Sequence, residues 1–367
     1  MKIDHNYLPR QFADIDAILD DIVGVVKRAD FTLGREVAEL EHDFARMVGT
    51  RHAIGVANGT DAIFLALKAL GVKPGCGNVI TTPYSFYATA SMIHHAGAMV
   101  QIVDVDRDFN LNPDFLEKSI MPATVGIVIV HWAGRPCRMN DILDIAKEHG
   151  LWVIEDCAHA HGSTYHDKGC GSIGDIGAFS LHPLKNVNVW GDGGVITTDS
   201  DKYAEWLRKA RNHGMTDRNT CEFWGWNSRL DTIQAVVAKH VLAHLPIQIQ
   251  ARRFNARLLD DELQKIPQIE LPVQRTGQFC NYYLYTFHAE RRDELRDFLV
   301  QNGVDAKVHY PVPLHKQPAA KVFGPLKEVP VAEWCANTTL SLPVHEFITE
   351  EDIETMTMLV RRFYDRS

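Results

Sequence analysis

The feature that most constrains the fold is an alternation, over the first two thirds of the chain, of short apolar runs with segments of helical period. The apolar runs are strand-length, and the segments between them repeat apolar residues at three and four positions. Strand–helix alternation of this kind predicts an α/β fold with a mostly parallel sheet and helices on both faces. The expected strands are 78–82, 98–105, 125–130, 151–154, 176–180 and 194–198, and the expected helices are 60–70, 88–96 and 139–149.

The composition of the chain changes in its last third, which predicts a second, smaller α/β domain. A chain of 367 residues is too long for one simple core. We place the boundary near Leu245, which gives a large domain over 1–245 and a small C-terminal domain over 246–367. The elements expected after residue 228 are helices 229–245, 248–265, 290–302 and 350–364 and strands 282–288 and 305–310.

Charge and composition exclude several classes of partner. The formal charge is −9, and no basic tract offsets it, so we expect no nucleic-acid partner. No apolar run approaches the ~20 residues that a membrane helix needs, and the N-terminus has no signal-peptide core, so we expect no membrane partner. The seven cysteines are scattered, without a C-x-x-C pair, as in a cytoplasmic protein with reduced thiols.

Two residues beside expected strands have side chains suited to catalysis. Asp156 ends an apolar strand, and strand-end acids lie at the sheet edge where open α/β sheets bind ligands. A helix cap or a solvated loop acid is the alternative. Lys185 lies in a polar loop between two apolar strands, before Gly193 and Gly194. It is a surface charge, a phosphate contact or a nucleophilic amine, and spacing does not choose between these.

A third site is the start of the helix at residues 60–70. Gly59 and Thr60 there would offer free N–H groups to an anion, although simple capping by Asn58 or Thr60 explains the same residues. The glycine fingerprints of nucleotide-binding loops are missing, which disfavours an NAD-dependent dehydrogenase. A lysine, an acid and an anion site together match the needs of pyridoxal 5'-phosphate (PLP), and Phe86 could stack on its ring unless it is a core aromatic.

These stretches resemble the DegT/DnrJ/EryC1/StrS family of sugar aminotransferases, which have PLP-transferase fold type I. The likeness extends over nearly the whole chain, and its segments in this order are more specific than any one alone. They are residues 31–34, 39–41, 57–62, 155–160, 180–185, 191–194, 227–231 and 309–314.

The resemblance implies a role for each matching residue. Lys185 would bond the PLP aldehyde and carry the proton, and Asp156 would keep the pyridine nitrogen protonated. The remaining cofactor contacts would be Gly59, Thr60, Phe86, His159, Ser180 and Asn227, the last reaching in from a neighbouring subunit, and the substrate contacts would be Tyr87, Arg229, His309 and Tyr310. His309 and Tyr310 would serve the partner subunit's site, so a homodimer is expected.

The same resemblance implies an aminotransferase that moves nitrogen from L-glutamate, released as 2-oxoglutarate, to a nucleotide-linked keto sugar. Departures from the family pattern are His159, Cys157 and Leu181, and none removes a chemical role. Some relatives carry histidine in place of the PLP lysine and act as sugar dehydratases. Because Lys185 is present, transamination is favoured over a dehydratase or lyase, and over a non-catalytic regulatory protein.

Overall fold

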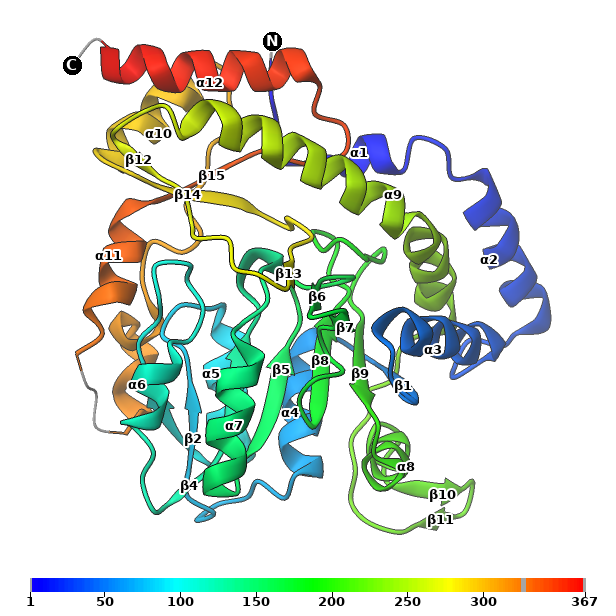
Figure 1. The fold of residues 1–367 in the computed structure, drawn as a ribbon. Coiled ribbons are helices and arrows are strands. Elements are labelled where there is room, and N and C mark those ends of the chain that lie inside the picture. Colours follow the sequence, from blue (N-terminus) through cyan, green and yellow to red (C-terminus); the bar gives the residue numbers. More distant parts are fainter. Residues whose placement is uncertain (1, 325–327, 366–367) are drawn as a thin grey trace.

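The centre of the molecule is a seven-stranded sheet with strand order β1-β9-β8-β5-β4-β2-β3 (Figure 1). A computed structural model describes residues 2–324 and 328–365. Strands β8, β5, β4, β2 and β3 run parallel, whereas β9 and β1 are antiparallel to their neighbours. This confirms the predicted mostly parallel sheet. The strands are β1 (His52–Val56), β2 (Asn78–Thr81), β3 (Met99–Ile102), β4 (Thr124–Val130), β5 (Trp152–Asp156), β8 (Ile176–Ser180) and β9 (Gly194–Thr198).

Helices cover both faces of this sheet because successive strand residues point to opposite sides. In β4, Val128 packs in the core on one face, while Ile127 and Ile129 pack in the core on the other. The first face is covered by α4 (Gly59–Ala69), α5 (Tyr87–Ala96) and α8 (Asp201–Ala210), and the second by α3 (Arg35–Val48), α7 (Met139–His149) and the first half of α9 (Thr232–Leu263).

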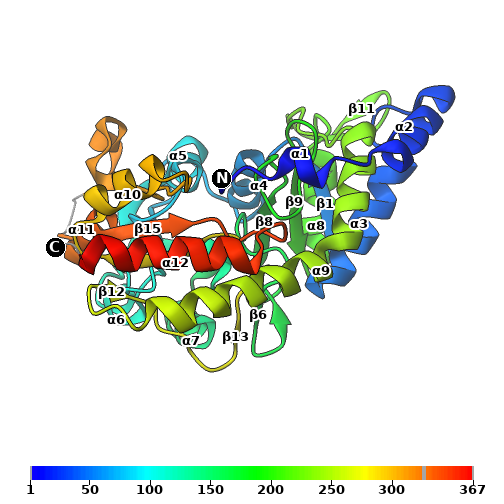
Figure 2. The same ribbon diagram turned by 90° about the horizontal axis from the view of Figure 1, so that it is seen from above.

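A smaller antiparallel sheet lies above the C-terminal edge of the large one (Figures 1 and 2). Its strands are β12 (Ile269–Glu270), β14 (Tyr285–Ala289) and β15 (Thr339–Leu342), and its core includes residues of α10 (Arg292–Gln301), α12 (Glu350–Asp365) and the second half of α9. Ile3 joins the same core and bridges to Val304, so the N-terminus returns to the C-terminal part of the chain.

Three expected elements differ in the structure. Helices 229–245 and 248–265 form one continuous helix, α9, with Pro246 inside it. Proline removes one helical hydrogen bond, but buried residues on both sides, such as Leu245 and Ile249, keep the axis in place. Residues 305–310 form no strand, since Lys307 alone bridges to Ser341. The domain division at residue 245 stays a prediction, and α9 runs through that point.

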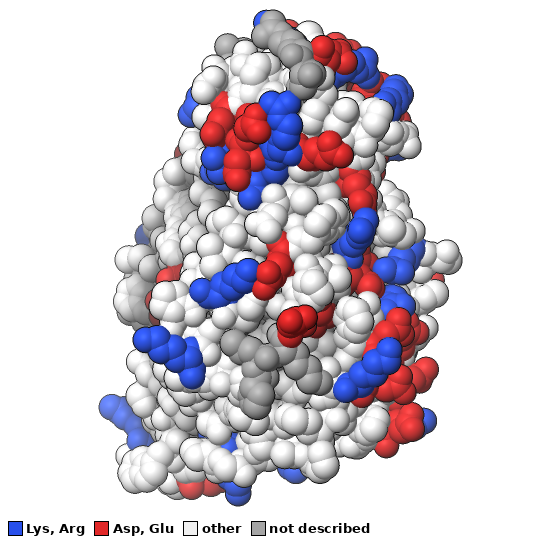
Figure 3. Space-filling model, turned by 90° about the vertical axis from the view of Figure 1, so that its left-hand side faces the viewer, with Lys and Arg blue, Asp and Glu red and all other residues white. Residues whose placement is uncertain are grey.

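The remaining elements are short or peripheral: α1 (Leu8–Gln11), α2 (Asp16–Arg28), α6 (Pro113–Glu117), α11 (Pro330–Thr338), β6 (Thr164–Tyr165), β7 (Lys168–Gly169), β10 (Met215–Asp217), β11 (Thr220–Cys221), β13 (Gln278–Phe279) and the 3-10 helices Trp132–Gly134, Leu314–Lys316 and Pro318–Val322. On the face in Figure 3, basic and acidic side chains are intermingled. Within 2–324 and 328–365, no helix combines the length and the apolar character needed to cross a bilayer.

Candidate active site

Asp156 is the last residue of β5 and is buried at the C-terminal edge of the large sheet. Thr89 Oγ1 donates a hydrogen bond to one carboxylate oxygen at 2.8 Å, and the Ala158 N–H donates to the other at 3.1 Å. Burial raises the pKa of Asp156, while these hydrogen bonds and the Lys185 charge act in the opposite direction. The Asp156 carboxylate is therefore fixed in position and incompletely neutralised, so it would interact favourably with a cation placed against it.

The neighbouring acid, Glu155, has a structural role. It is fully buried, and its oxygens accept hydrogen bonds from His131 and from the backbone N–H groups of Gly171, Ile173 and Gly174. Burial alone would raise its pKa, but the hydrogen bonds from His131 and the backbone outweigh burial and lower it. Glu155 thus connects the loop after β7 to the sheet by hydrogen bonds. Of the two neighbouring acids, Asp156 is therefore the one available to interact with a ligand.

Lys185 lies between β8 and β9, and β8 is the strand next to β5. Its backbone is held because its N–H donates to the His182 carbonyl and its own carbonyl accepts from Asn188 Nδ2 at 3.0 Å. The amine lies 3.4 Å from the Tyr283 hydroxyl and 4.7 Å from the centre of that ring. Its charge lowers the pKa of both Asp156 and His159, so the structure brings lysine and aspartate to one site.

The start of α4 packs directly against the end of β8. A Cβ added to Gly59 would lie 2.5 Å from Ser180 Cβ, so only glycine allows this approach. The first turn of a helix leaves N–H groups without intrahelical acceptors, here those of Gly59 and Thr60 beside the Ser180 hydroxyl. Asn58 also caps the helix by accepting from the Asp61 N–H at 2.8 Å. Capping and an anion cradle therefore coexist at this terminus.

His159 is buried between two aromatic rings. Tyr283 stacks on it at 4.4 Å, and Trp132 meets it edge-on at 5.2 Å. Burial, followed by the charge of Lys185, lowers its pKa well below the ordinary value, so the imidazole is neutral at physiological pH. Its Nδ1 accepts from the Ala133 N–H at 3.3 Å, which leaves the proton on Nε2 as a donor.

An aromatic group forms another side of the site. Phe86 and Tyr87, at the start of α5, are 51% and 56% exposed, so Phe86 is no core residue. The ring of Tyr310 lies 6.2 Å from Phe86 and 5.3 Å from Trp132. His309 is held by Tyr84, whose hydroxyl donates to its carbonyl at 2.6 Å. Within the chain, Tyr310 therefore lies beside Phe86 and Trp132, and the expectation that His309 and Tyr310 serve the partner's site stays a prediction.

Asn227 and Arg229 both contact Asn212. Asn227 is exposed and bridges to Asn212 just after α8, and Arg229 donates to the Asn212 side chain at 3.0 Å. Among the described residues, neither is hydrogen-bonded to Lys185 or Asp156.

Three residues that contact the site were not predicted from the sequence: Thr89, Tyr283 and Asn281. Thr89 looks like an ordinary helix residue, and Tyr283 was expected to lie within strand 282–288, whereas β14 begins at Tyr285. No local pattern distinguishes them, since their partners Asp156 and Lys185 are 67 and 98 positions away.

A buried aspartate and a lysine at the edge of a mostly parallel sheet, next to a helix N-terminus with free N–H groups, are typical of PLP-dependent transferases. Residues 13–361 match the DegT/DnrJ/EryC1/StrS aminotransferase family. The chain belongs to this family and is an aminotransferase enzyme, as the sequence resemblance implied.

Known relatives and structures cover almost the full chain. It is 38% identical to a "Pleiotropic regulatory protein" of Geobacillus stearothermophilus, covering 96% of this chain and 94% of that protein. It is 37% identical to a UDP-N-acetyl-3-dehydro-alpha-D-glucosamine 3-aminotransferase of Acidithiobacillus ferrooxidans, covering 95% and 94%. The crystal structure of S. venezuelae DesV in complex with a ketimine intermediate has a TM-score of 0.96 at 35% identity, covering 100% and 99%.

Proposed function

We propose that this enzyme holds PLP on Lys185 and transfers an amino group from L-glutamate to a nucleotide-linked keto sugar. The observation that carries the proposal is that Asp156, at the end of β5, and Lys185, in the loop after the neighbouring strand β8, lie at one site. The charge of Lys185 acts on the pKa of Asp156. An amine for the aldehyde and an acid for the pyridine nitrogen are the two groups that PLP chemistry requires.

The residues of the site fit this cofactor. The cradle at Gly59, Thr60 and Ser180 suits a phosphate, because a helix N-terminus favours an anion and glycine permits close approach. Asp156 is buried and short of counter-charge, which suits a protonated pyridine nitrogen. Phe86 offers an exposed ring for stacking.

When bound, PLP supplies an electron sink that stabilises negative charge on the substrate carbon. The chain's own groups do the rest. The Lys185 amine would take the proton from the donor's α-carbon and deliver it to the cofactor's C4' carbon, and in the second half-reaction it would carry a proton from that carbon to the sugar carbon that is aminated. The neutral His159 donates its Nε2 proton to an oxygen on the cofactor ring, and Asp156 keeps the pyridinium charged. Tyr87, His309 and Tyr310 line the substrate side.

The assembly is a homodimer in this proposal. Asn227 is exposed and Arg229 is hydrogen-bonded to Asn212, and a partner subunit would bring these two residues to the cofactor phosphate and the substrate. The proposed substrate follows from relatives that are named as acting on UDP- and dTDP-linked sugars. Cytoplasmic location is supported by seven free cysteines.

A reconstitution experiment tests the function. The purified protein is mixed with PLP, and we expect a visible absorption band that borohydride fixes to Lys185, located by peptide mass spectrometry. A panel of nucleotide-linked keto sugars is then offered with glutamate, and 2-oxoglutarate release is measured. Lys185→Ala is the control and should release none. If the wild-type protein takes up no PLP, the proposal is wrong.

A non-catalytic regulatory role is the second candidate, because a relative 38% identical to this chain carries a regulatory name. That role predicts bound PLP without glutamate consumption across the whole panel. A dehydratase on the same scaffold would release a dehydrated sugar without consuming glutamate, so product analysis with and without glutamate separates the three.

A further inference from the structure

Tyr283 lies just before β14 of the small sheet and contacts Lys185. Its hydroxyl is 3.4 Å from the Lys185 amine, and the amine is 4.7 Å from the ring centre. The same ring stacks on His159 at 4.4 Å with 24° between the planes. One side chain thus contacts both the lysine and the histidine of the proposed PLP site.

The backbone of Tyr283 is held firmly by Asn281, which is completely buried. Asn281 Oδ1 accepts from the Tyr283 N–H at 2.8 Å, and its Nδ2 donates to the carbonyls of His159 and His161, both at 2.9 Å. An added Cβ at Gly134 would lie 1.7 Å from Asn281 Oδ1, so this contact depends on glycine there. Asn281 therefore fixes Tyr283 and His159 relative to each other.

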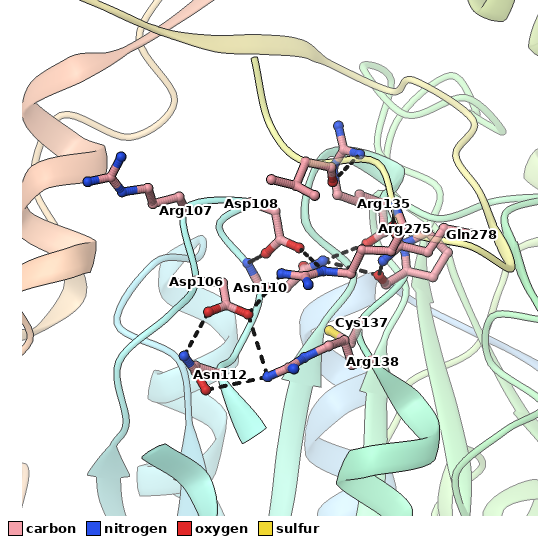
Figure 4. Close-up of polar contacts among 12 residues, drawn as sticks. Asp106, Arg107, Asp108, Asn110, Asn112, Arg135, Cys137, Arg138, Arg275 and Gln278 are labelled. Atoms are coloured by element: carbon pink, nitrogen blue, oxygen red, sulfur yellow. Dashed lines mark hydrogen bonds and ion pairs between the residues drawn. The ribbon is translucent and has the colours of Figure 1, made fainter. Parts of the chain in front are cut away.

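The rest of this segment is clamped to the large domain upstream of Asn281. Arg275 forms ion pairs with Asp106 and Asp108, each at 3.2 Å, and Gln278 donates to the Pro136 carbonyl at 2.5 Å. Figure 4 shows Arg275, on the segment that leads to Tyr283, pointing toward Asp108 and Asp106 of the loop after β3. With both ends of residues 275–281 tied down, the ring has little freedom to leave the site.

From this geometry we propose that Tyr283 is a positioning residue of the active site. Its hydroxyl accepts a hydrogen bond from the Lys185 amine, its ring face lies against that amine, and its stacking fixes the plane of His159. The inference rests on the proposed function, since it gives Lys185 and His159 their reactive orientation. It adds a residue next to β14 of the small sheet to a site whose lysine and aspartate lie at the edge of the large sheet.

The test compares Tyr283→Phe, which keeps the ring and loses the hydroxyl, with Tyr283→Leu, which loses both. Tyr282→Phe is the matched control. Among the described residues, the Tyr282 hydroxyl hydrogen-bonds only to the Gln274 side chain, from which it accepts. Reductive methylation of each PLP-free protein with formaldehyde and borohydride is followed at Lys185 by peptide mass spectrometry. Melting temperatures verify that each variant is folded.

We expect Lys185 to react roughly fivefold faster in Tyr283→Phe than in wild type, the effect of losing one hydrogen bond, and faster still in Tyr283→Leu. Tyr282→Phe should match wild type. With PLP added, Tyr283→Phe should lower kcat while leaving KM for the sugar unchanged. Equal methylation rates in wild type and Tyr283→Phe would overturn the inference. Since methylation needs no PLP, this result is separate from a failure of the proposed function.

Discussion

The contact between Gly59 and Ser180 gives a sharp prediction for Gly59→Ala. The new Cβ would lie 2.5 Å from Ser180 Cβ, where ordinary contact begins at 3.4 Å, so α4 and β8 must separate by about 0.9 Å. Overpacking of this kind costs about 1–3 kcal/mol of folding free energy. The same shift moves the Gly59 and Thr60 N–H groups away from a bound phosphate, and losing one such charged hydrogen bond lowers PLP affinity about tenfold or more.

Urea unfolding of the PLP-free protein measures the stability, and absorbance titration measures the PLP affinity. The control is Gly24→Ala in the interior of α2, where the nearest atom to an added Cβ is Arg28 NH1 at 3.4 Å, and a gain of about 0.5–1 kcal/mol is expected. The double variant Gly59→Ala with Ser180→Gly should recover part of the stability but no affinity, because the new Cβ would still lie 2.9 Å from the Cα of residue 180. Unchanged stability and affinity in Gly59→Ala would refute the reasoning.

Three further predictions concern the polar groups of the site. Lys185→Ala should abolish transamination and leave the free energy of unfolding within about 1 kcal/mol of wild type, and normal turnover would contradict its assigned role. Asp156→Asn should abolish activity yet stabilise the PLP-free protein above neutral pH. The folded pKa of Asp156 is raised, so the wild type loses stability as pH rises from about 4, by about 1.4 kcal/mol for each pH unit by which the pKa is raised, and the variant escapes this loss. Identical unfolding curves at pH 8 would show that the carboxylate carries no burial cost. Asn281→Ala should cost about 3 kcal/mol or more, because three buried hydrogen bonds are lost, and its urea midpoint should fall accordingly; a midpoint equal to wild type would mean that the segment is held elsewhere.

Much of the site's framework could be predicted because it follows from local pattern. Asp156 and Ser180 end apolar runs that became β5 and β8, and Gly59 precedes a helical period that became α4. Parallel strands end at the same edge, so locating the strands locates the residues after them. Lys185 could be located between two strands, but its chemistry could not be derived from spacing and came from resemblance.

The period of a sequence determines secondary structure within a few turns, and for that reason the alternation in this chain predicts most strands of its large sheet, several of its helices and the sheet edge at which Asp156 lies. Only the tertiary structure decided that Tyr283 contacts the amine, and that His309 is held by Tyr84, 225 positions away. It also decided that α9 continues past Pro246, because packing on both sides outweighs one lost hydrogen bond. Such contacts depend on how complete helices and strands pack against one another, and no local sequence pattern indicates that packing.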